Sequence, residues 1–358
     1  MTSDERRRYI ALIREQALPL EQLPPPTLPP RFAERLFTGV SPVVLTPAGT
    51  AAGVSPVGPD PAGTAAGHAG GSSVPMPGIK AVLFDVYGTL FSSAAGDINA
   101  GVEKIQSSAV NPGADAASRG LSTASAPDRT GSGLDALARE YTDSASGEEL
   151  VSYFHKAVRE SHAASKAAYP EVLAGEIWER FPGRKIPAEE FALRYELAVN
   201  PVYPMAGAKQ LLASLKEAGF VMGIISNAQF YTPLLFEALL GGSPEALGFS
   251  PELLVYSYME GEAKPSPLLF EKARAALKKQ GIGGGETVYL GNDMRNDIQG
   301  AARAGFRTVL FAGDRRSLRL REDDPLISLL PCAVVSKLAD FEQLLKRSPS
   351  SADNEKGA

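Results

Sequence analysis

The sequence holds one cysteine, Cys332, in 358 residues. A single cysteine excludes an internal disulfide framework and a thiolate metal cluster, and it makes a reducing compartment the simpler assumption. No apolar run approaches the roughly 20 residues that cross a bilayer. No apolar segment follows the basic N-terminus, so we see no secretory signal. We therefore expect a cytoplasmic protein that has no membrane partner.

Positive charge is not in excess either. Lys and Arg number 36 against 41 Asp and Glu, which gives a formal net charge of -5. This balance argues against a nucleic-acid-binding surface spread over the whole protein. With 44% hydrophobic residues the chain can build a globular core. A small-molecule substrate is therefore the expected partner, and the sequence leaves the oligomeric state open.

Changes in composition divide the chain into segments. Residues 1–38 are predicted to be an N-terminal helical head, with a short amphipathic helix over 5–23 that ends at a proline run. Residues 39–77 carry two tandem copies of a 14-residue Pro-, Gly- and Ala-rich repeat, which offers little to bury and indicates a flexible linker. Residues 347–358 are predicted to be a disordered tail.

Short apolar runs rich in β-branched and aromatic residues indicate buried strands at 79–84, 220–225, 253–257, 287–290, 307–311 and 332–335. Helical patterns separate them at 206–218, 267–280, 297–304 and 337–345. Strands that alternate with helices imply a parallel sheet with helices on both faces. We therefore predict an α/β fold, a doubly wound, Rossmann-like core made of residues 78–91 and 201–346.

Residues 92–200 interrupt this alternation. They begin with a Ser-, Ala- and Gly-rich stretch at 107–133, which predicts a disordered loop. Helical patterns follow it, and no strand pattern is present. The segment is therefore predicted to be a mostly helical insertion between the first and second core strands.

Polar residues gather where the predicted strands end. In an open parallel sheet, ligands bind at the carboxyl ends of the strands, so such residues are the first candidates for a site. The four segments concerned are Asp85-Val86-Tyr87-Gly88-Thr89, Ser226-Asn227, Lys264-Pro265 and Gly291-Asn292-Asp293-Met294-Arg295-Asn296-Asp297.

The chemistry of these segments suits a covalent hydrolysis. A carboxylate such as Asp85 can attack an electrophile to give an ester that water then hydrolyses. With Asp293 and Asp297 nearby, an anionic substrate would be repelled unless Lys264 and a Mg²⁺ ion offset the charge. The hydroxyl groups of Ser226 and Thr89 and the backbone of the Gly88 turn can hold the transferring oxygens.

In this order, the four segments resemble the four motifs of the haloacid dehalogenase superfamily, over roughly residues 79–345. The resemblance implies that the insertion is a helical, C1-type cap, which closes over the active site and selects the substrate. It also implies a nucleophile at Asp85, a phosphate-binding pair at Ser226 and Asn227, a catalytic cation at Lys264, and a metal site that includes the acids Asp85, Asp293 and Asp297.

The residue two positions after the nucleophile departs from the phosphatase pattern. Phosphatases of this superfamily usually carry a second aspartate there, and this chain has Tyr87. A tyrosine with a pKa near 10 is a poor base at neutral pH, although its backbone carbonyl can still bind Mg²⁺. The Asp-x-Tyr-Gly-Thr form is similar to the 2-haloacid dehalogenases, which displace halide from carbon and need no metal.

The fourth segment favours hydrolysis of a phosphate ester over dehalogenation. An acid at Asp293 is hard to explain without a cation to neutralise it, and no arginine stands at the expected distance after Asp85 to hold a halide. A Mg²⁺-dependent phosphatase acting on a small phosphorylated metabolite is therefore the leading prediction. A 2-haloacid dehalogenase-like enzyme is one alternative, and a non-catalytic scaffold with a binding or regulatory role is another.

One basic stretch stays outside these motifs. Arginines recur shortly after the strand predicted at 307–311, and they could steer an anionic substrate. Acidic residues at 322–324 favour a plain solvated loop instead. The arginines are Arg315, Arg316, Arg319 and Arg321.

Overall fold

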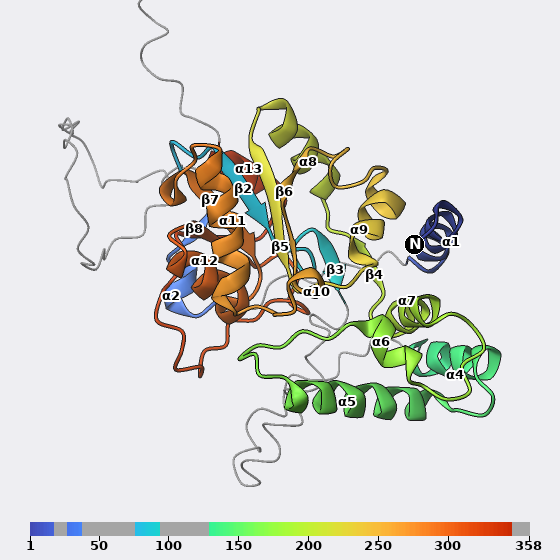
Figure 1. The fold of residues 1–358 in the computed structure, drawn as a ribbon. Coiled ribbons are helices and arrows are strands. Elements are labelled where there is room, and N and C mark those ends of the chain that lie inside the picture. Colours follow the sequence, from blue (N-terminus) through green and yellow to red (C-terminus); the bar gives the residue numbers. More distant parts are fainter. Residues whose placement is uncertain (18–26, 38–75, 94–128, 346–358) are drawn as a thin grey trace, which may run out of the picture.

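The computed structural model describes residues 1–17, 27–37, 76–93 and 129–345, and a parallel sheet forms its centre (Figure 1). Seven strands lie in the order β1-β9-β8-β7-β2-β5-β6, and every pairing is parallel. Predicted runs supply six of them. The bounds are Leu36–Phe37 (β1), Ala81–Phe84 (β2), Val221–Ser226 (β5), Phe249–Tyr256 (β6), Thr287–Gly291 (β7), Arg307–Phe311 (β8) and Ala333–Val335 (β9).

Strand β2 lies in the middle of the sheet and is buried on both faces. Val82 and Phe84 belong to one hydrophobic cluster, whereas Ala81 and Leu83 belong to another. This division follows from the alternation of side chains along a strand. A strand buried on both sides reads as a continuous apolar run, which is why the sequence pattern located it.

Helices cover the two faces of the sheet. Helices α8 (Ala208–Glu217) and α13 (Leu338–Leu345) contribute to the cluster of Val82, while α11 (Pro267–Lys279) and α12 (Gly300–Arg303) contribute to the cluster of Leu83. The predicted doubly wound α/β core is thereby confirmed. The shorter elements are α9 (Thr232–Leu235), η1 (Phe236–Leu240), α10 (Ser257–Glu260), η2 (Gly284–Glu286) and η3 (Met294–Gln299).

Within its described residues 129–200, the insertion has four helices, which lie below the sheet in the view of Figure 1. They are α4 (Arg129–Tyr141), α5 (Gly147–Ala164), α6 (Ala174–Glu179) and α7 (Ala188–Val199). These helices enclose an aromatic core of their own around Trp178, which is fully buried. We call this group the cap.

One short strand corrects the expectation that residues 92–200 hold no strand. Strand β3 (Phe91–Ser93) reaches into the start of the insertion and pairs antiparallel with β4 (Val202–Pro204), which follows the insertion. Three residues are too few to show the period-two pattern of a strand, so this pairing depends on a contact between distant parts of the chain. The predicted loop 107–133 is also too long, because α4 already begins at Arg129; residues 107–128 lie outside the described residues.

The N-terminal segment packs on the body of the protein. Helix α1 (Ser3–Gln16) buries Ile13 in the cluster of Val82. Arg6 pairs with Glu237 of the core, and Arg8 pairs with Glu190 of the cap at 2.7 Å. After α2 (Pro30–Ala33), β1 extends the central sheet beside β9.

Two predicted segments fall largely outside what the structure describes. They are the linker at 39–77, of which only residues 76 and 77 are described, and the tail at 347–358. Among the described helices, none is long and apolar enough to cross a membrane.

Candidate active site

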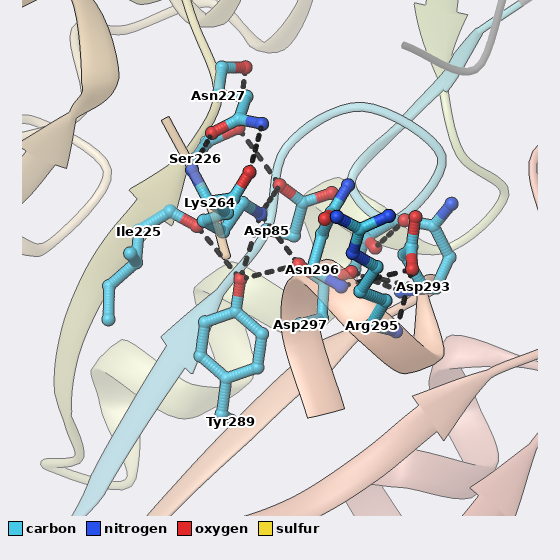
Figure 2. A network of polar contacts seen from close by, with 12 residues as sticks. Asp85, Ile225, Ser226, Asn227, Lys264, Tyr289, Asp293, Arg295, Asn296 and Asp297 are labelled. Carbon is cyan, nitrogen blue, oxygen red and sulfur yellow. Dashed lines mark hydrogen bonds and ion pairs between the residues drawn. The ribbon is translucent and has the colours of Figure 1, made fainter. Parts of the chain in front are cut away.

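Asp85 lies at the carboxyl end of β2 and is 5% exposed (Figure 2). Its Oδ1 accepts hydrogen bonds from Ser226 Oγ at 2.9 Å and from Lys264 Nζ at 2.7 Å. No donor from the described part of the chain is bonded to its Oδ2. Oδ1 therefore fixes the carboxylate in place, and Oδ2 is available to react with a substrate.

Lys264 is a buried cation shared by two carboxylates. Its Nζ lies 2.7 Å from Asp85 Oδ1 and 2.6 Å from Asp297 Oδ1, and it also donates to Tyr289 Oη at 3.2 Å. Burial by itself lowers the pKa of Lys264, but Asp297 and Asp85 outweigh burial and raise this pKa above its ordinary value. Lys264 is therefore charged at neutral pH.

Asp297 anchors Lys264 from the opposite side. Its Oδ1 accepts from Lys264 Nζ and from Tyr289 Oη, and its Oδ2 accepts the backbone N–H groups of Asn292 and Asp293, both at 2.9 Å. Burial raises the pKa of Asp297 above its ordinary value, and Lys264 opposes this rise. Both oxygens of Asp297 are thus used within the protein.

Asn227 holds the backbone of Lys264. Its Oδ1 accepts the Lys264 N–H at 2.6 Å, and its Nδ2 donates to the Lys264 carbonyl at 3.4 Å. Ser226, the last residue of β5, is fully buried and donates to Asp85. The second and third predicted segments therefore meet at Asp85, and the roles of Ser226 and Asn227 toward a substrate stay predictions.

The turn after Asp85 packs against the fourth segment. Gly88 has a φ of +84°, and a Cβ placed there would lie 2.5 Å from Asn292 Nδ2. Only glycine tolerates both the left-handed backbone and this close approach. The hydroxyl of Thr89, which is fully buried, donates to Asn292 Oδ1 at 3.2 Å. The predicted substrate contacts of Gly88 and Thr89 stay untested, since here both serve the contact with Asn292.

The side chain of Tyr87 is buried in the hydrophobic core. Its hydroxyl is bonded to Thr232 Oγ1 at 2.9 Å, and burial raises its pKa well above the ordinary value of a tyrosine. A phenol held in this way cannot serve as a base at neutral pH. Its backbone carbonyl accepts no hydrogen bond from the described residues, so that oxygen is available to a cation.

Replacing Tyr87 by phenylalanine tests this placement. We expect kcat/KM to stay within about threefold of the parent value, whereas loss of a general acid or base costs about 100-fold or more. The free energy of unfolding should fall by about 1 kcal/mol, because one buried hydrogen bond to Thr232 is lost. Steady-state kinetics and urea unfolding measure both, and a 100-fold loss of kcat/KM would contradict the assignment.

The structure does not gather the four predicted metal ligands. Both oxygens of Asp293 are paired with Arg321, at 2.9 Å from Nε to Oδ1 and 2.7 Å from Nη2 to Oδ2 (Figure 2 shows Asp293 apart from Asp85). Asp297 is bonded to Lys264 as described above. Within the described residues, no three or more His, Cys, Asp or Glu side chains are grouped so as to hold a metal ion. Asp85 and the Tyr87 carbonyl are the predicted ligands that keep an oxygen available.

The arginine-rich loop is also different from the expected solvated loop. Arg321 binds Asp293, and Arg316 binds Asp314 at 3.0 Å. The backbone of Arg319 donates to the Asn292 carbonyl and accepts the Met294 N–H. Ser317 accepts a hydrogen bond from the side chain of Asn292 through its carbonyl. The loop is therefore packed along the fourth segment.

Two residues that the sequence motifs did not include join the site: Tyr289, which no motif contains, and Arg321, which was expected in a solvated loop. The hydroxyl of Tyr289 bridges Lys264, Asp297 and the carbonyl of Ile225, which lies 2.8 Å away. A tyrosine inside an otherwise apolar strand was the available signal, because a buried phenol needs a polar partner. For Arg321 the sequence offers no such signal, since its partner Asp293 lies 28 residues away.

The cap is fastened to two of the site loops. The side chain of Gln229, two residues after Asn227, accepts the Ala174 N–H at 2.9 Å and donates to the Val172 carbonyl at 2.7 Å. The N–H of Ala263, next to Lys264, donates to the Tyr169 carbonyl at 2.8 Å. A movement of the cap would therefore displace the loops that carry Asn227 and Lys264.

Comparisons with known proteins point to one family. A model of the haloacid dehalogenase-like hydrolase family matches residues 79–305. A phosphoglycolate phosphatase from Xylella fastidiosa is 31% identical over 160 residues, which is 44% of this chain and 62% of that protein. A phosphoserine phosphatase from Thermus thermophilus is 32% identical over 168 residues, or 46% and 61% of the two chains. This chain thus spans about three-fifths of the length of these relatives.

Solved structures of similar proteins include a HAD phosphatase from Thermococcus onnurineus, with 18% identity, a TM-score of 0.45, and coverage of 75% of this chain and 98% of that one. The L-2-haloacid dehalogenase RSc1362 has 15% identity, a TM-score of 0.43, and coverage of 75% and 99%.

Proposed function

Since this chain belongs to the haloacid dehalogenase-like hydrolases, we propose that it hydrolyses a small phosphate monoester through a covalent intermediate on Asp85. The contact that carries the proposal is the one between Lys264 and Asp85. A buried carboxylate that is paired with a lysine, with one oxygen unbonded within the described residues, is oriented for nucleophilic attack. Similarity to phosphatases that act on phosphoglycolate and phosphoserine supports phosphorus as the electrophile.

The reaction then runs in two displacements. Asp85 Oδ2 attacks phosphorus, and the bond from phosphorus to the ester oxygen breaks. The alcohol leaves with a proton from water, because the Tyr87 hydroxyl is directed into the core. A water molecule next cleaves the acyl phosphate, which releases inorganic phosphate and restores the carboxylate. Throughout, Ser226 and Lys264 hold Asp85 Oδ1, so the carboxylate keeps its direction.

Magnesium is part of the proposal with a smaller ligand set than the sequence suggested. Mg²⁺ commonly binds through one or two carboxylates and keeps several water molecules. The Tyr87 carbonyl would hold the ion together with the substrate phosphate, because Asp85 Oδ1 is bonded to Ser226 and Lys264 and Asp85 Oδ2 is the attacking oxygen. Asp293 and Asp297 are already bonded within the protein. When bound, the ion would supply positive charge that brings an anionic substrate to Asp85.

Dehalogenation is the second candidate, because Tyr87 stands where phosphatases carry an aspartate. The experiment measures phosphate release from an aryl phosphate, with Mg²⁺ or with EDTA, beside halide release from 2-chloropropionate. We expect phosphate release that EDTA abolishes. Halide release that persists in EDTA would overturn the proposal in favour of the second candidate, and absence of both activities would favour a non-catalytic scaffold.

A further inference from the structure

Arg321 stands at the outer end of a chain of charged contacts that leads to Asp85. Its guanidinium makes a two-pronged pair with Asp293, and both side chains are largely buried, at 17% and 10% exposure. Such a fork-shaped contact fixes direction as well as distance, which a single point contact does not. Arg321 thereby fixes the Asp293 carboxylate.

Asp293 in turn fixes the start of η3. Its Oδ1 accepts the N–H groups of Arg295 and Asn296, as an N-cap residue does. Its backbone N–H, together with that of Asn292, holds Asp297 Oδ2. The position of Asp297 is therefore set by a turn whose cap is paired with Arg321.

Asp297 positions Lys264, which in turn positions Asp85. Its other oxygen holds Lys264 at 2.6 Å, and Lys264 holds Asp85 at 2.7 Å. The sequence of contacts thus runs from Arg321 through Asp293, Asp297 and Lys264 to Asp85. Each link is a hydrogen bond or an ion pair between buried or mostly buried groups, where a displacement is costly.

The backbone of the same loop adds a second line of contact. Arg319 N–H donates to the Asn292 carbonyl at 3.0 Å, and Met294 N–H donates to the Arg319 carbonyl at 2.9 Å. Arg321 itself has a φ of 48°, in the left-handed region that disfavours residues with a side chain. The ion pair with Asp293 helps to hold Arg321 in this unfavourable backbone conformation.

We propose that Arg321 is a positioning residue for the hydrolysis, and that Asp293 serves as its anchor and not as a metal ligand. The guanidinium supplies the positive charge that Asp293 was expected to receive from Mg²⁺. This inference rests on the proposed function for its kinetic consequences. Its structural part, the order of the turn 291–297, can be tested without turnover.

The kinetic test compares Arg321→Met, Arg321→Lys, Asp293→Asn and the double variant. Loss of the pair should lower kcat by about 10- to 100-fold with KM within about threefold, because Lys264 and Asp85 are misplaced while the substrate contacts remain. Lysine should restore part of the loss, since it keeps the charge without the fork. The double variant should be no slower than either single one, as expected for two residues that act as a unit.

Arg184→Met is the matched control. Arg184 is a cap arginine of similar exposure, 15%, and it is paired with Glu179 at 3.0 Å. Its loss should leave kcat unchanged, because it contacts Trp178 and Glu179 of the cap, which are not part of the chain of contacts that leads to Asp85. A similar fall in kcat for Arg184→Met would mean that loss of any largely buried arginine slows this protein, and would overturn the assignment.

Two further measurements separate the inference from the proposed function. Hydrogen exchange by mass spectrometry should quicken in the peptide that covers residues 291–297 of Arg321→Met and stay unchanged in the peptide that covers β5. Unchanged exchange at 291–297 would overturn the inference even if the wild-type protein is inactive in every assay. Mn²⁺ binding followed by electron paramagnetic resonance should be alike in the wild type and Asp293→Asn. A tenfold loss of Mn²⁺ affinity confined to Asp293→Asn would make Asp293 a metal ligand and overturn the inference.

Discussion

Replacing Asp85 by asparagine is expected to lower kcat for phosphate release by about 10⁴- to 10⁶-fold, the loss typical when a nucleophile is removed. The amide keeps the shape of the carboxylate, so Ser226 and the surrounding β2 turn can stay in place. It cannot, however, form the acyl phosphate. Rapid acid quenching of the wild-type reaction, followed by mass spectrometry, should place one phosphoryl group on the peptide that carries Asp85.

Stability provides the control for Asp85→Asn. Lys264 keeps Asp297 as a partner in this variant, so the cation is not left alone. We therefore expect a folded protein with the circular dichroism spectrum of the parent. If the folded variant kept more than a tenth of the parent rate, Asp85 could not be the nucleophile, and the covalent mechanism would be withdrawn.

The second large effect concerns Lys264. Replacing it by methionine should lower the free energy of unfolding by about 3–5 kcal/mol, because Asp85 and Asp297 are left buried without their shared cation. It should also lower kcat by about 100- to 1000-fold, as when a preorganised electrostatic contact is lost from an active site. Urea unfolding and steady-state kinetics measure the two losses.

A double variant separates charge balance from chemistry. Adding Asp297→Asn to Lys264→Met removes one of the two buried carboxylates, so part of the lost stability should return while activity should not. Lys272→Met is the surface control, since Lys272 pairs with Glu260 and its side chain is 49% exposed; it should change stability by no more than about 1 kcal/mol. If Lys264→Met were as stable as the wild type, the buried ion pairs would not have the role assigned to them.

The pH range for these comparisons follows from the pKa of Lys264. Two carboxylates raise that pKa in the folded protein, so the stabilising charge is fully present below the unfolded value near 10.5 and is lost only as pH rises through the higher folded value. Burial raises the pKa of Asp297, the partner of Lys264, to about 7, so this ion pair is fully charged only above that value, and the two stabilities are best compared near pH 9.

Much of the core could be predicted from the sequence, because burial in the sheet is what makes the strand residues apolar. Strand β2 is buried on both faces, and its residues are accordingly apolar without interruption. The strands are parallel, so the residues at the carboxyl ends of β2 and β5 had to meet at one edge of the sheet. Asp85 and Ser226 are found together there for that reason.

Other features could not be read because they depend on which distant groups come together. Strand β1 has two residues, and only its pairing with β9 makes it a strand. Strands β3 and β4 have three residues each, and they pair across the two ends of the insertion. Such strands have no periodicity of their own, so a pattern in one stretch of sequence cannot reveal them.

The fourth segment, residues 291–297, was predicted in part from the sequence. The sequence predicts acidic residues near the site there, because they follow β7, which belongs to the same sheet as β2. Whether an acid faces Asp85, Lys264 or an arginine from a later loop depends on the rotamers and on the course of residues 314–321. Asp297 meets Lys264, whereas Asp293 meets Arg321.

By itself, the sequence determined the parallel core, the edge at which the site lies, and Asp85 as the candidate nucleophile. These follow from hydrophobic periodicity and chain order, which are local properties. Only the tertiary structure decided that the Tyr87 hydroxyl is buried against Thr232, that Tyr289 joins the site, and that Arg321 neutralises Asp293. Side-chain direction and charge pairing depend on groups brought together by folding, and no single stretch of the chain contains both partners.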